Sequence, residues 1–600
     1  MADGTLMANT TAAEIDQRLD GMDAEQLPAG EHEQHGAGHF AGLYAAENVA
    51  GTEFIFGATF VILGASMVDV IIGLAIGNLL AVLSFRFLAA PIAVGTRMSV
   101  YTYLERVAGG SVSKLFNGLN AFLFAIISAA MITVSATAFR LVLNFDAQTE
   151  PFPTSLSFII LALAFGSVAV LVAAFGFNAL AEFASICAPW LVTMFAVGGL
   201  VMLPAISQAA TGSTIVDGWS GFIDIGDSEI FTGRTPEGDA GISLLGIIGF
   251  SWGANSFAHT GMIDMSLLRY AKKGWYGYMS ATGMFLGHYM AWISAGFMGA
   301  AAAVIVKISI TDIEPGNVAF QALGYAGLVV VVVAGWTTAN ANLYRSGLAA
   351  QGVVTTLSRK KATLIIGVIV LIASIFPFIY RNYLIFVTYA GITLVPVGAI
   401  LFASYWILPR MGMTTYWARY KGVTNTPALM TWGITLALAA SAVAFGLMPV
   451  YFAFVPAFIL AIVLYVLFAR MMGATDSYPE GEAYDVAFYE RVEVLHTEQA
   501  KKSLPDVDKR DHRKLTGALK VVWIVDLLIV FATALFVLLA SPDVGTYEAH
   551  RDQFFWVAGV CTVVYFVAAY WELRRRKAHR VEIMEQHEPA HSAESQTQST

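Results

Sequence analysis

Apolar runs of about 20 residues recur along most of the chain and alternate with short polar segments. A run of this length crosses a hydrocarbon core of roughly 30 Å as an α-helix. The alternation of short apolar segments and turns that is typical of an outer-membrane barrel is absent. The pattern therefore predicts an all-α polytopic membrane protein. We expect about 14 spans, at residues 41–63, 67–90, 115–143, 155–175, 178–204, 241–266, 276–306, 318–348, 362–380, 383–408, 428–447, 450–471, 518–541 and 553–573.

The charges between these runs predict the orientation of the chain. Lysine and arginine gather in alternate loops, such as 269–273 and 359–361, whereas the long loop 206–240 on the other side is acidic. Basic loops stay in the cytoplasm. We therefore expect a multi-pass protein of the cytoplasmic (inner) membrane with both termini in the cytoplasm.

The same pattern divides the chain into five parts. A polar, acidic tail is expected to be disordered because it has too few apolar residues to form a core. The other parts are a large membrane core, a charged cytoplasmic linker, a two-helix appendage and a second cytoplasmic tail. In order, the parts are residues 1–38, 39–472, 473–517, 518–575 and 576–600.

Composition agrees with a membrane protein and excludes several function classes. Of the 600 residues, 57% are hydrophobic and 13% are charged, which does not suit a soluble protein of this size. The two cysteines lie in apolar runs, so no disulfide framework is expected. The sequence contains no phosphate-binding loop, nucleophile elbow or zinc-binding spacing. We expect neither an enzyme nor a nucleic-acid-binding protein; the expected partners are the lipid bilayer, a small-molecule substrate and a coupling cation.

Polar residues interrupt the first span in the stretch ENVAGTEFIFG, residues 47–57. Gly51 permits local unwinding, which frees backbone carbonyls, such as those of Glu47 and Ala50, to bind a cation. Glu53 lies deeper in the apolar run and, with Gly51, is a candidate for substrate binding. The alternative is that the span begins later, so that Glu47 lies at the membrane interface.

A second interruption occurs in the sixth span, in SWGANSFAHTG, residues 251–261. Aromatic rings next to amide, hydroxyl and imidazole groups suit a flat ligand with polar edges. The candidate ligand-binding residues here are Trp252, Ser256, Phe257 and His259. The alternative is that small and polar residues join this helix to its neighbours.

The third cluster, AGWTTANANLYRSG, lies in the eighth span at residues 334–347. On a helix, Ala334, Thr337 and Thr338 share one face and present one carbonyl and two hydroxyl oxygens, which suit Na⁺. Threonine in a membrane helix also bonds to its own backbone, which is the alternative here.

The placement of the first two clusters predicts the architecture. Spans 1 and 6 each begin a group of five helices, at about 41–204 and 241–408, and each contains a glycine-interrupted segment. Paired interruptions of this kind indicate inverted repeats with a binding site between them.

Several segments resemble the nucleobase–cation symporter family of cytosine and purine permeases. The specific segment is WTTANANLYRSGL at 336–348; NSFAHTGMIDMSLLRY, IIGLAIGNLLAVL and ITLVPVGAILFASYW resemble the family's spans 6, 2 and 10. The resemblance covers about the first 470 residues and marks a divergent member, with Ala339 in place of the family's asparagine. It implies a leucine-transporter-type fold of 5+5 inverted repeats with about 12 core helices, to which two C-terminal helices are added here.

The resemblance also implies roles for individual residues. Thr337 and Thr338 would bind the cation with backbone carbonyls of span 1, and Asn340 would lie near the substrate. Ser256 and Phe257 would line its pocket. The family's stacking and amide pair in span 3 would correspond to Phe124 and Ser128.

These observations predict cation-coupled symport of a nucleobase or related small heterocycle, with Na⁺ or H⁺ as the coupling ion and no other cofactor. Proton coupling through His259 or Glu53, for this or another small polar solute, is an alternative. A nutrient sensor with a transporter fold, in which residues 473–600 relay the signal, is a further alternative.

Overall fold

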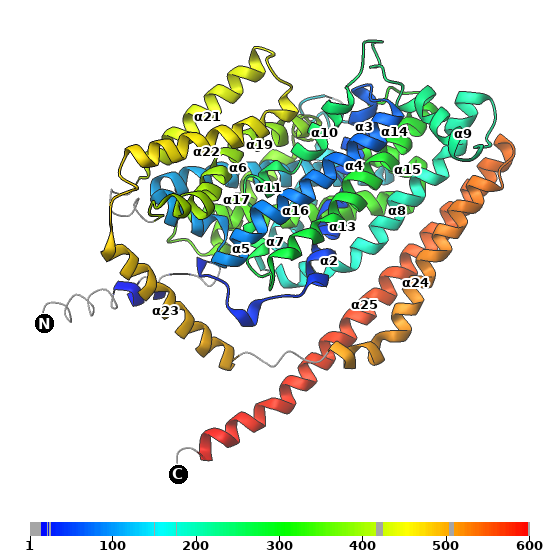
Figure 1. The fold of residues 1–600 in the computed structure, drawn as a ribbon. Coiled ribbons are helices and arrows are strands. Elements are labelled where there is room, and N and C mark those ends of the chain that lie inside the picture. Colours follow the sequence, from blue (N-terminus) through cyan, green and yellow to red (C-terminus); the bar gives the residue numbers. More distant parts are fainter. Residues whose placement is uncertain are drawn as a thin grey trace, which may run out of the picture.

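The structure, a computed structural model, describes residues 14–17, 19–20, 22, 26–148, 150–175, 177–415, 424–502 and 509–597. These residues form one helical body with a long helical hairpin along one side (Figure 1). Within them, 11 helices are long and apolar enough to cross a membrane. The other three of the 14 predicted spans are the broken helices at 41–63 and 241–266 and a short helix within 362–380. The multi-pass prediction is therefore confirmed.

The first five-helix repeat begins with a broken helix. Its bounds are α2 (Ala37–Asn48), α3 (Glu53–Ile62), α4 (Met67–Ser84), η3 (Phe85–Ala89), α5 (Ala90–Thr96), α6 (Val100–Leu143), α7 (Leu156–Phe175) and α8 (Phe177–Thr211). A loop with α9 (Gly218–Ile225) and η4 (Gly226–Ile230) leads to the second repeat.

The second repeat begins with a broken helix as well. It comprises α10 (Leu244–Gly253), α11 (Ser256–His259), α12 (Met265–Leu268), η5 (Gly274–Ser280), α13 (Ala281–Gly283), η6 (Met284–Ala291), α14 (Trp292–Val306), α15 (Pro315–Leu323), α16 (Tyr325–Val353), α17 (Arg359–Ser374), α18 (Pro377–Arg381), α19 (Tyr383–Phe402) and η7 (Ala403–Ile407).

The remaining elements continue the body and form the hairpin. They are η8 (Pro409–Met411), α21 (Thr426–Ala444), η9 (Val450–Phe452), α22 (Phe454–Met471), α23 (Pro479–Lys502), α24 (Lys509–Leu539) and α25 (Val544–Thr597), and η2 (Glu31–Glu33) precedes α2. The helices α6 and α16 pack along each other at the centre of the body. In the apolar 18-residue stretch of each helix, 83% is buried in α6 and 78% in α16.

Local chemistry sets several helix boundaries. The side chains of Ser66, Ser99, Ser243 and Asn425 accept hydrogen bonds from backbone N–H groups in the first turns of α4, α6, α10 and α21. Such caps satisfy donors that a helix start leaves unpaired.

Two predicted spans differ from the observed helices. The span predicted at 318–348 is two helices, α15 and α16, because Gly324 adopts a positive φ of 60° between them. The span predicted at 362–380 ends at Ser374, because Pro377 disfavours helical geometry at the residue before it.

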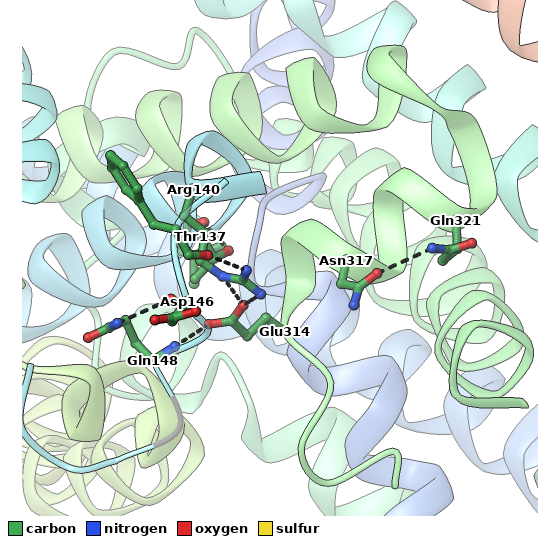
Figure 2. A network of polar contacts seen from close by, with 9 residues as sticks. Thr137, Arg140, Asp146, Gln148, Glu314, Asn317 and Gln321 are labelled. Carbon is green, nitrogen blue, oxygen red and sulfur yellow. Dashed lines mark hydrogen bonds and ion pairs between the residues drawn. The ribbon is translucent and has the colours of Figure 1, made fainter. Parts of the chain in front are cut away.

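A buried ion pair joins α6 to α15 on the side of the body opposite α23. Arg140, in the last turn of α6, pairs with Glu314, which immediately precedes α15 (Figure 2). The backbone N–H of Gln148 also donates to Glu314, at 3.1 Å. Because both charges are buried, the pair fixes α15 against the end of the central helix.

The C-terminal hairpin, predicted as an appendage, packs along α8. The hydroxyl of Tyr565 donates to the carbonyl of Ile186 at 2.7 Å, and the rings of Trp190 and Phe566 lie 5.0 Å apart. At the hairpin turn, Thr214 donates to the carbonyl of Ser541 at 2.7 Å. The hairpin therefore contacts the first repeat over the length of one helix.

The segment predicted as a charged linker contains α23, which lies against the body (Figure 1). Arg106, in the first part of α6, forms a buried ion pair with Asp485 of α23 at 2.7 Å. The rings of Phe488 and Tyr489 cover its guanidinium group at 5.4 and 4.5 Å. This side of the molecule, the α23 face, is the side that we expect to be cytoplasmic.

Part of the tail that we expect to be disordered is ordered on the α23 face. The N–H of Ala29 donates to the carbonyl of Arg97 at 2.7 Å, and the ring of His496 in α23 contacts the carbonyl of Pro28 at 2.7 Å. Leu27 is buried. Residues 26–36 are therefore held between α23 and the body, whereas residues 1–13 lie outside the described residues.

We predict that Asp485→Asn detaches α23, because it leaves the buried Arg106 charge without its counter-charge. Removing one partner of a buried pair costs roughly 3–5 kcal/mol. Hydrogen exchange in residues 479–497 should accelerate strongly. The matched control is Glu493→Gln in the same helix, whose half-exposed pair with Arg97 contributes about 1 kcal/mol or less. Equal exchange in both variants would contradict the prediction.

Candidate functional site

The break in the first span lies at residues 49–52, between α2 and α3. Gly51 lies in this break against α16. A Cβ atom at this position would come within 3.2 Å of the backbone nitrogen of Gly335. The two glycines therefore allow the unwound backbone to approach the central helix closely.

The break in the second repeat faces the first. Asn255 lies between α10 and α11, and its Nδ2 donates to Oδ1 of Asn48, the last residue of α2, at 3.0 Å. One side-chain hydrogen bond thus joins the two interruptions. An interrupted helix inside a membrane requires such partners, because the freed polar groups have no water to bond.

A buried carboxylate caps the break in the first span. Glu53 is 1% exposed and accepts hydrogen bonds from Thr52 Oγ1 at 3.2 Å, from the N–H of Ala50 at 3.3 Å and from the indole N–H of Trp292. The ring of His288 stacks on Trp292 at 4.4 Å. Glu53 forms no ion pair with any residue that the structure describes.

A cavity of about 60 Å³ lies between the two breaks and α16. Its lining combines the carboxylates of Glu47 and Glu53, the guanidinium of Arg345, four aromatic rings including that of His288, and several amide and hydroxyl groups. The lining residues include Glu53, Asn255, Phe257, Thr338, Asn342 and Tyr383. The volume is well below the roughly 300 Å³ at the low end of pockets for drug-sized ligands. In this state the cavity is therefore too small for such a ligand.

Three charges close the cavity on the side toward the α23 face. Arg345 of α16 pairs with Glu47 of α2 and lies 3.5 Å from Asp264, which follows α11. Its guanidinium also lies 5.8 Å from the centre of the Phe124 ring. We call Glu47, Arg345 and Asp264 the charge triad. It connects α2 and the segment between α11 and α12 to the central helix α16.

Comparison with known proteins gives a fold but no close relative. No family model matches the chain, and no curated protein matches it. A structure titled as the inward-facing conformation of Mhp1 has a TM-score of 0.58 at 18% identity, over 77% of this chain and 97% of that one. A second Mhp1 structure is titled as a nucleobase-cation-symport-1 family transporter in a closed conformation with bromovinylhydantoin bound. Its TM-score is 0.58 at 17% identity, over 78% of this chain and 99% of that one.

A structure titled as a Na⁺-coupled sialic acid symporter, in a substrate-bound outward-open state, has a TM-score of 0.52. It is 15% identical and covers 73% of this chain and 90% of that one. The protein has the leucine-transporter fold. The architecture predicted from the paired interruptions is therefore confirmed.

Within this fold, the structure brings some of the predicted site residues to one cavity. Gly51 lies in the break beside the cavity, and Glu47, Glu53, Phe257 and Thr338 line it. Two partners in this arrangement, Arg345 and Asp264, are absent from our sequence-based set. The sequence contained a signal for both residues. Each is a charged residue near the end of a predicted span, and a charge inside the membrane requires a partner.

The predicted cation ligands are already bonded to the backbone. Thr338 donates to the carbonyl of Ala334 at 2.8 Å, and Thr337 donates to the carbonyls of Val333 and Ala334 at 2.9 and 3.2 Å. The carbonyl of Ala50 accepts from the N–H of Glu53 at 3.2 Å. The two hydroxyls donate in these bonds and keep their acceptor lone pairs, and the carbonyl of Ala50 keeps one, so hydrogen bonding alone does not remove them as ligands. The carbonyl of Ala334 already accepts from both hydroxyls.

The other predicted site residues lie around the cavity but outside its lining. Trp252 donates to Ser84 Oγ at 3.0 Å, and His259 contacts the carbonyl of Trp252 at 3.1 Å. Ser128 bonds to the carbonyls of Phe124 and Ala339.

Two further predicted residues, Ser256 and Asn340, are also buried outside the lining. Ser256 lines a separate small pocket, and Asn340 Nδ2 donates to the carbonyl of Trp336 at 2.9 Å. The amide nitrogen of Asn340 therefore bonds to its own helix, whereas its Oδ1 is buried without a partner among the described residues.

We predict that Arg345→Met lowers the stability of the folded protein by about 3–5 kcal/mol, because it leaves the buried carboxylate of Asp264 and the partly buried carboxylate of Glu47 without their counter-charge. Thermal unfolding of the detergent-solubilised protein, followed by tryptophan fluorescence, measures the loss. The additional substitution Asp264→Asn should recover part of it. Arg410→Met, which removes an exposed guanidinium stacked on Trp406, is the matched control. An unchanged melting temperature in Arg345→Met would contradict the role of the triad.

Proposed function

We propose that the protein is a secondary active transporter that couples the entry of a cation to the uptake of a small heterocycle such as a nucleobase. The observation that carries this proposal is the cavity at the two facing helix breaks, which the Asn48–Asn255 hydrogen bond joins. Interrupted helices that meet at mid-membrane are the usual site of substrate and ion binding in secondary transporters.

The lining of the cavity supports a flat, polar-edged substrate. Phe257 and Tyr383 provide ring faces, and Asn255 and Asn342 provide amide groups. Amides bond to neighbouring donors and acceptors on a heterocycle, while rings stack on its faces. Because the cavity is smaller than such a molecule, we propose that substrate enters a more open state and that the observed arrangement is a closed one.

The same cavity supports cation coupling. Glu53 is a buried carboxylate without an ion-pair partner among the described residues, and Thr338 lines the same space. A carboxylate in this position requires a cation, either Na⁺ with hydroxyl and carbonyl oxygens or a proton. The similar structures include a nucleobase-cation-symport-1 family transporter and a Na⁺-coupled symporter, which favours the same class.

The proposal is tested by uptake of radiolabelled uracil or hydantoin into proteoliposomes. Uptake should rise above the equilibrium level when a Na⁺ gradient or a proton gradient is imposed, and it should stay at equilibrium when both are absent. Replacing Na⁺ by choline at fixed pH identifies the ion. Equal uptake with and without both gradients would contradict cation coupling.

We predict that Glu53→Gln abolishes gradient-driven uptake for either ion, because the amide binds neither a proton nor Na⁺ as the carboxylate does. If Na⁺ is the ion, Thr338→Ala should raise the Na⁺ concentration for half-maximal uptake about tenfold or more, since one contact to a charged group is worth roughly 1.5–3 kcal/mol. The matched control is Thr393→Ala. Its hydroxyl also bonds to its own helix, at 2.8 Å, but is exposed and lies outside the cavity. An unchanged Na⁺ dependence in Thr338→Ala would remove this residue from the cation site.

A further inference from the structure

The N-terminal segment 26–36, which we call the strap, crosses the α23 face and leads directly into α2. The side chains of Leu27 and Ala29 in the strap are buried. The N–H of Ala29 donates to the carbonyl of Arg97, the residue that follows α5, at 2.7 Å. The strap is therefore packed against the body just before the first broken helix begins.

The strap also bonds to the inner part of the second broken helix. The N–H of His35 donates to the carbonyl of Tyr270 at 2.7 Å, and the guanidinium of Arg269 donates to the carbonyl of Leu27 at 3.5 Å. Arg269 and Tyr270 directly follow α12. The strap therefore links the two segments that carry the carboxylates of the charge triad, one of which it continues into and one of which it bonds to.

The helix α23 holds the strap in place. The ring of His496 contacts the carbonyl of Pro28 at 2.7 Å and lies 5.9 Å from the ring of His32. Two turns earlier on the same side of the molecule, Asp485 of α23 forms its buried ion pair with Arg106 of α6, at 2.7 Å. The helix α23 therefore contacts the strap and the first part of the central helix α6 at the same time.

A second cavity, of about 380 Å³, lies among the elements that the strap joins. Gln26 of the strap lines it together with residues of α6, α12 and α16. The charged residues Glu105 and Arg269 belong to the lining, which suits a space that water enters. Ser266, a buried residue of the lining, lies two residues after Asp264 of the charge triad. The strap is therefore part of the wall of a polar space next to the triad.

The contacts of the strap limit how the central cavity can open. The charge triad closes that cavity toward the α23 face, so a solute can pass on this side only when the segments that carry the triad separate. The strap bonds across these segments and must release first. The helix α23 holds the strap through one face of a single helix, so that its detachment requires local opening and not global unfolding.

We propose that α23 is an autoinhibitory clamp. Docked on the strap, it keeps the α23 side of the molecule closed, and its release makes the second cavity and the charge triad accessible from that side. This assigns a regulatory role to a segment that the sequence predicts only as a charged linker. The effect of the clamp on transport rests on the proposed function, whereas its effect on access does not.

The accessibility of an introduced thiol tests the clamp. Ser266→Cys places a thiol in the second cavity, and the native thiols of Cys187 and Cys561 are buried. The full-length protein in detergent is treated with a charged thiosulfonate reagent, and the parent protein without Ser266→Cys gives the background rate. Adding Asp485→Asn should accelerate modification at least about tenfold, because losing one partner of a buried ion pair shifts the docking equilibrium by that factor or more. Glu493→Gln is the matched control and should leave the rate nearly unchanged, because its ion pair is half-exposed.

A reversible cross-link tests the opposite change. The double variant His32→Cys/His496→Cys replaces two rings that lie 5.9 Å apart, so a short reducible thiol cross-linker can fix the strap to α23. In proteoliposomes, the cross-link should stop gradient-driven uptake of radiolabelled uracil or hydantoin, and a reductant should restore it. The two single-cysteine variants, treated in the same way, control for modification without cross-linking.

The two experiments separate the clamp from the proposed function. Thermal unfolding confirms that each variant is folded. If hydrogen exchange shows that Asp485→Asn detaches α23 while Ser266→Cys is modified at an unchanged rate, the clamp is overturned. Full uptake by the cross-linked protein also overturns the clamp and leaves the proposed function standing. Absence of uptake before cross-linking contradicts the proposed function instead, and the modification rates, which require no substrate, still decide on the clamp.

Discussion

The need to satisfy backbone polar groups away from water controls this structure. Two helices are interrupted within the apolar part of the chain, and each interruption is tolerated because it faces the other and the central helix α16. The hydrogen bond between Asn48 and Asn255 joins them, and Gly51 and Gly335 allow the backbones to approach. The cavity follows from this arrangement, since it occupies the space that the two breaks leave beside α16.

Buried arginines connect α23, α15 and the two broken helices to the central helix pair. Arg106 and Arg140, near the two ends of α6, pair with α23 and with the start of α15. Arg345 of α16 pairs with Glu47 and Asp264 in the two broken helices. Burying an ion pair costs desolvation free energy, and removing only one partner costs more because the other charge stays buried. Such a pair therefore determines which segments meet, and adds little to stability.

The distribution of these charges divides the interior into compartments. The central cavity at the two breaks is small, at about 60 Å³, and a second cavity toward the α23 face, lined by residues of α6, α12 and α16, has about 380 Å³. The charge triad lies between them.

The sequence by itself determined the spans and the two breaks, because hydropathy, helix length and the position of glycine and polar residues are local properties. It also contained an unused signal for the docking of α23, since Asp485, Phe488 and Val492 recur at helical spacing and are buried together. Only the tertiary structure decided the partners. Arg345 and Glu47 are 298 residues apart, and the hydroxyls of Thr337 and Thr338 bond to their own helix. The chemistry of a side chain determines which groups it can bind. Long-range packing determines which of those groups lie within bonding distance of it.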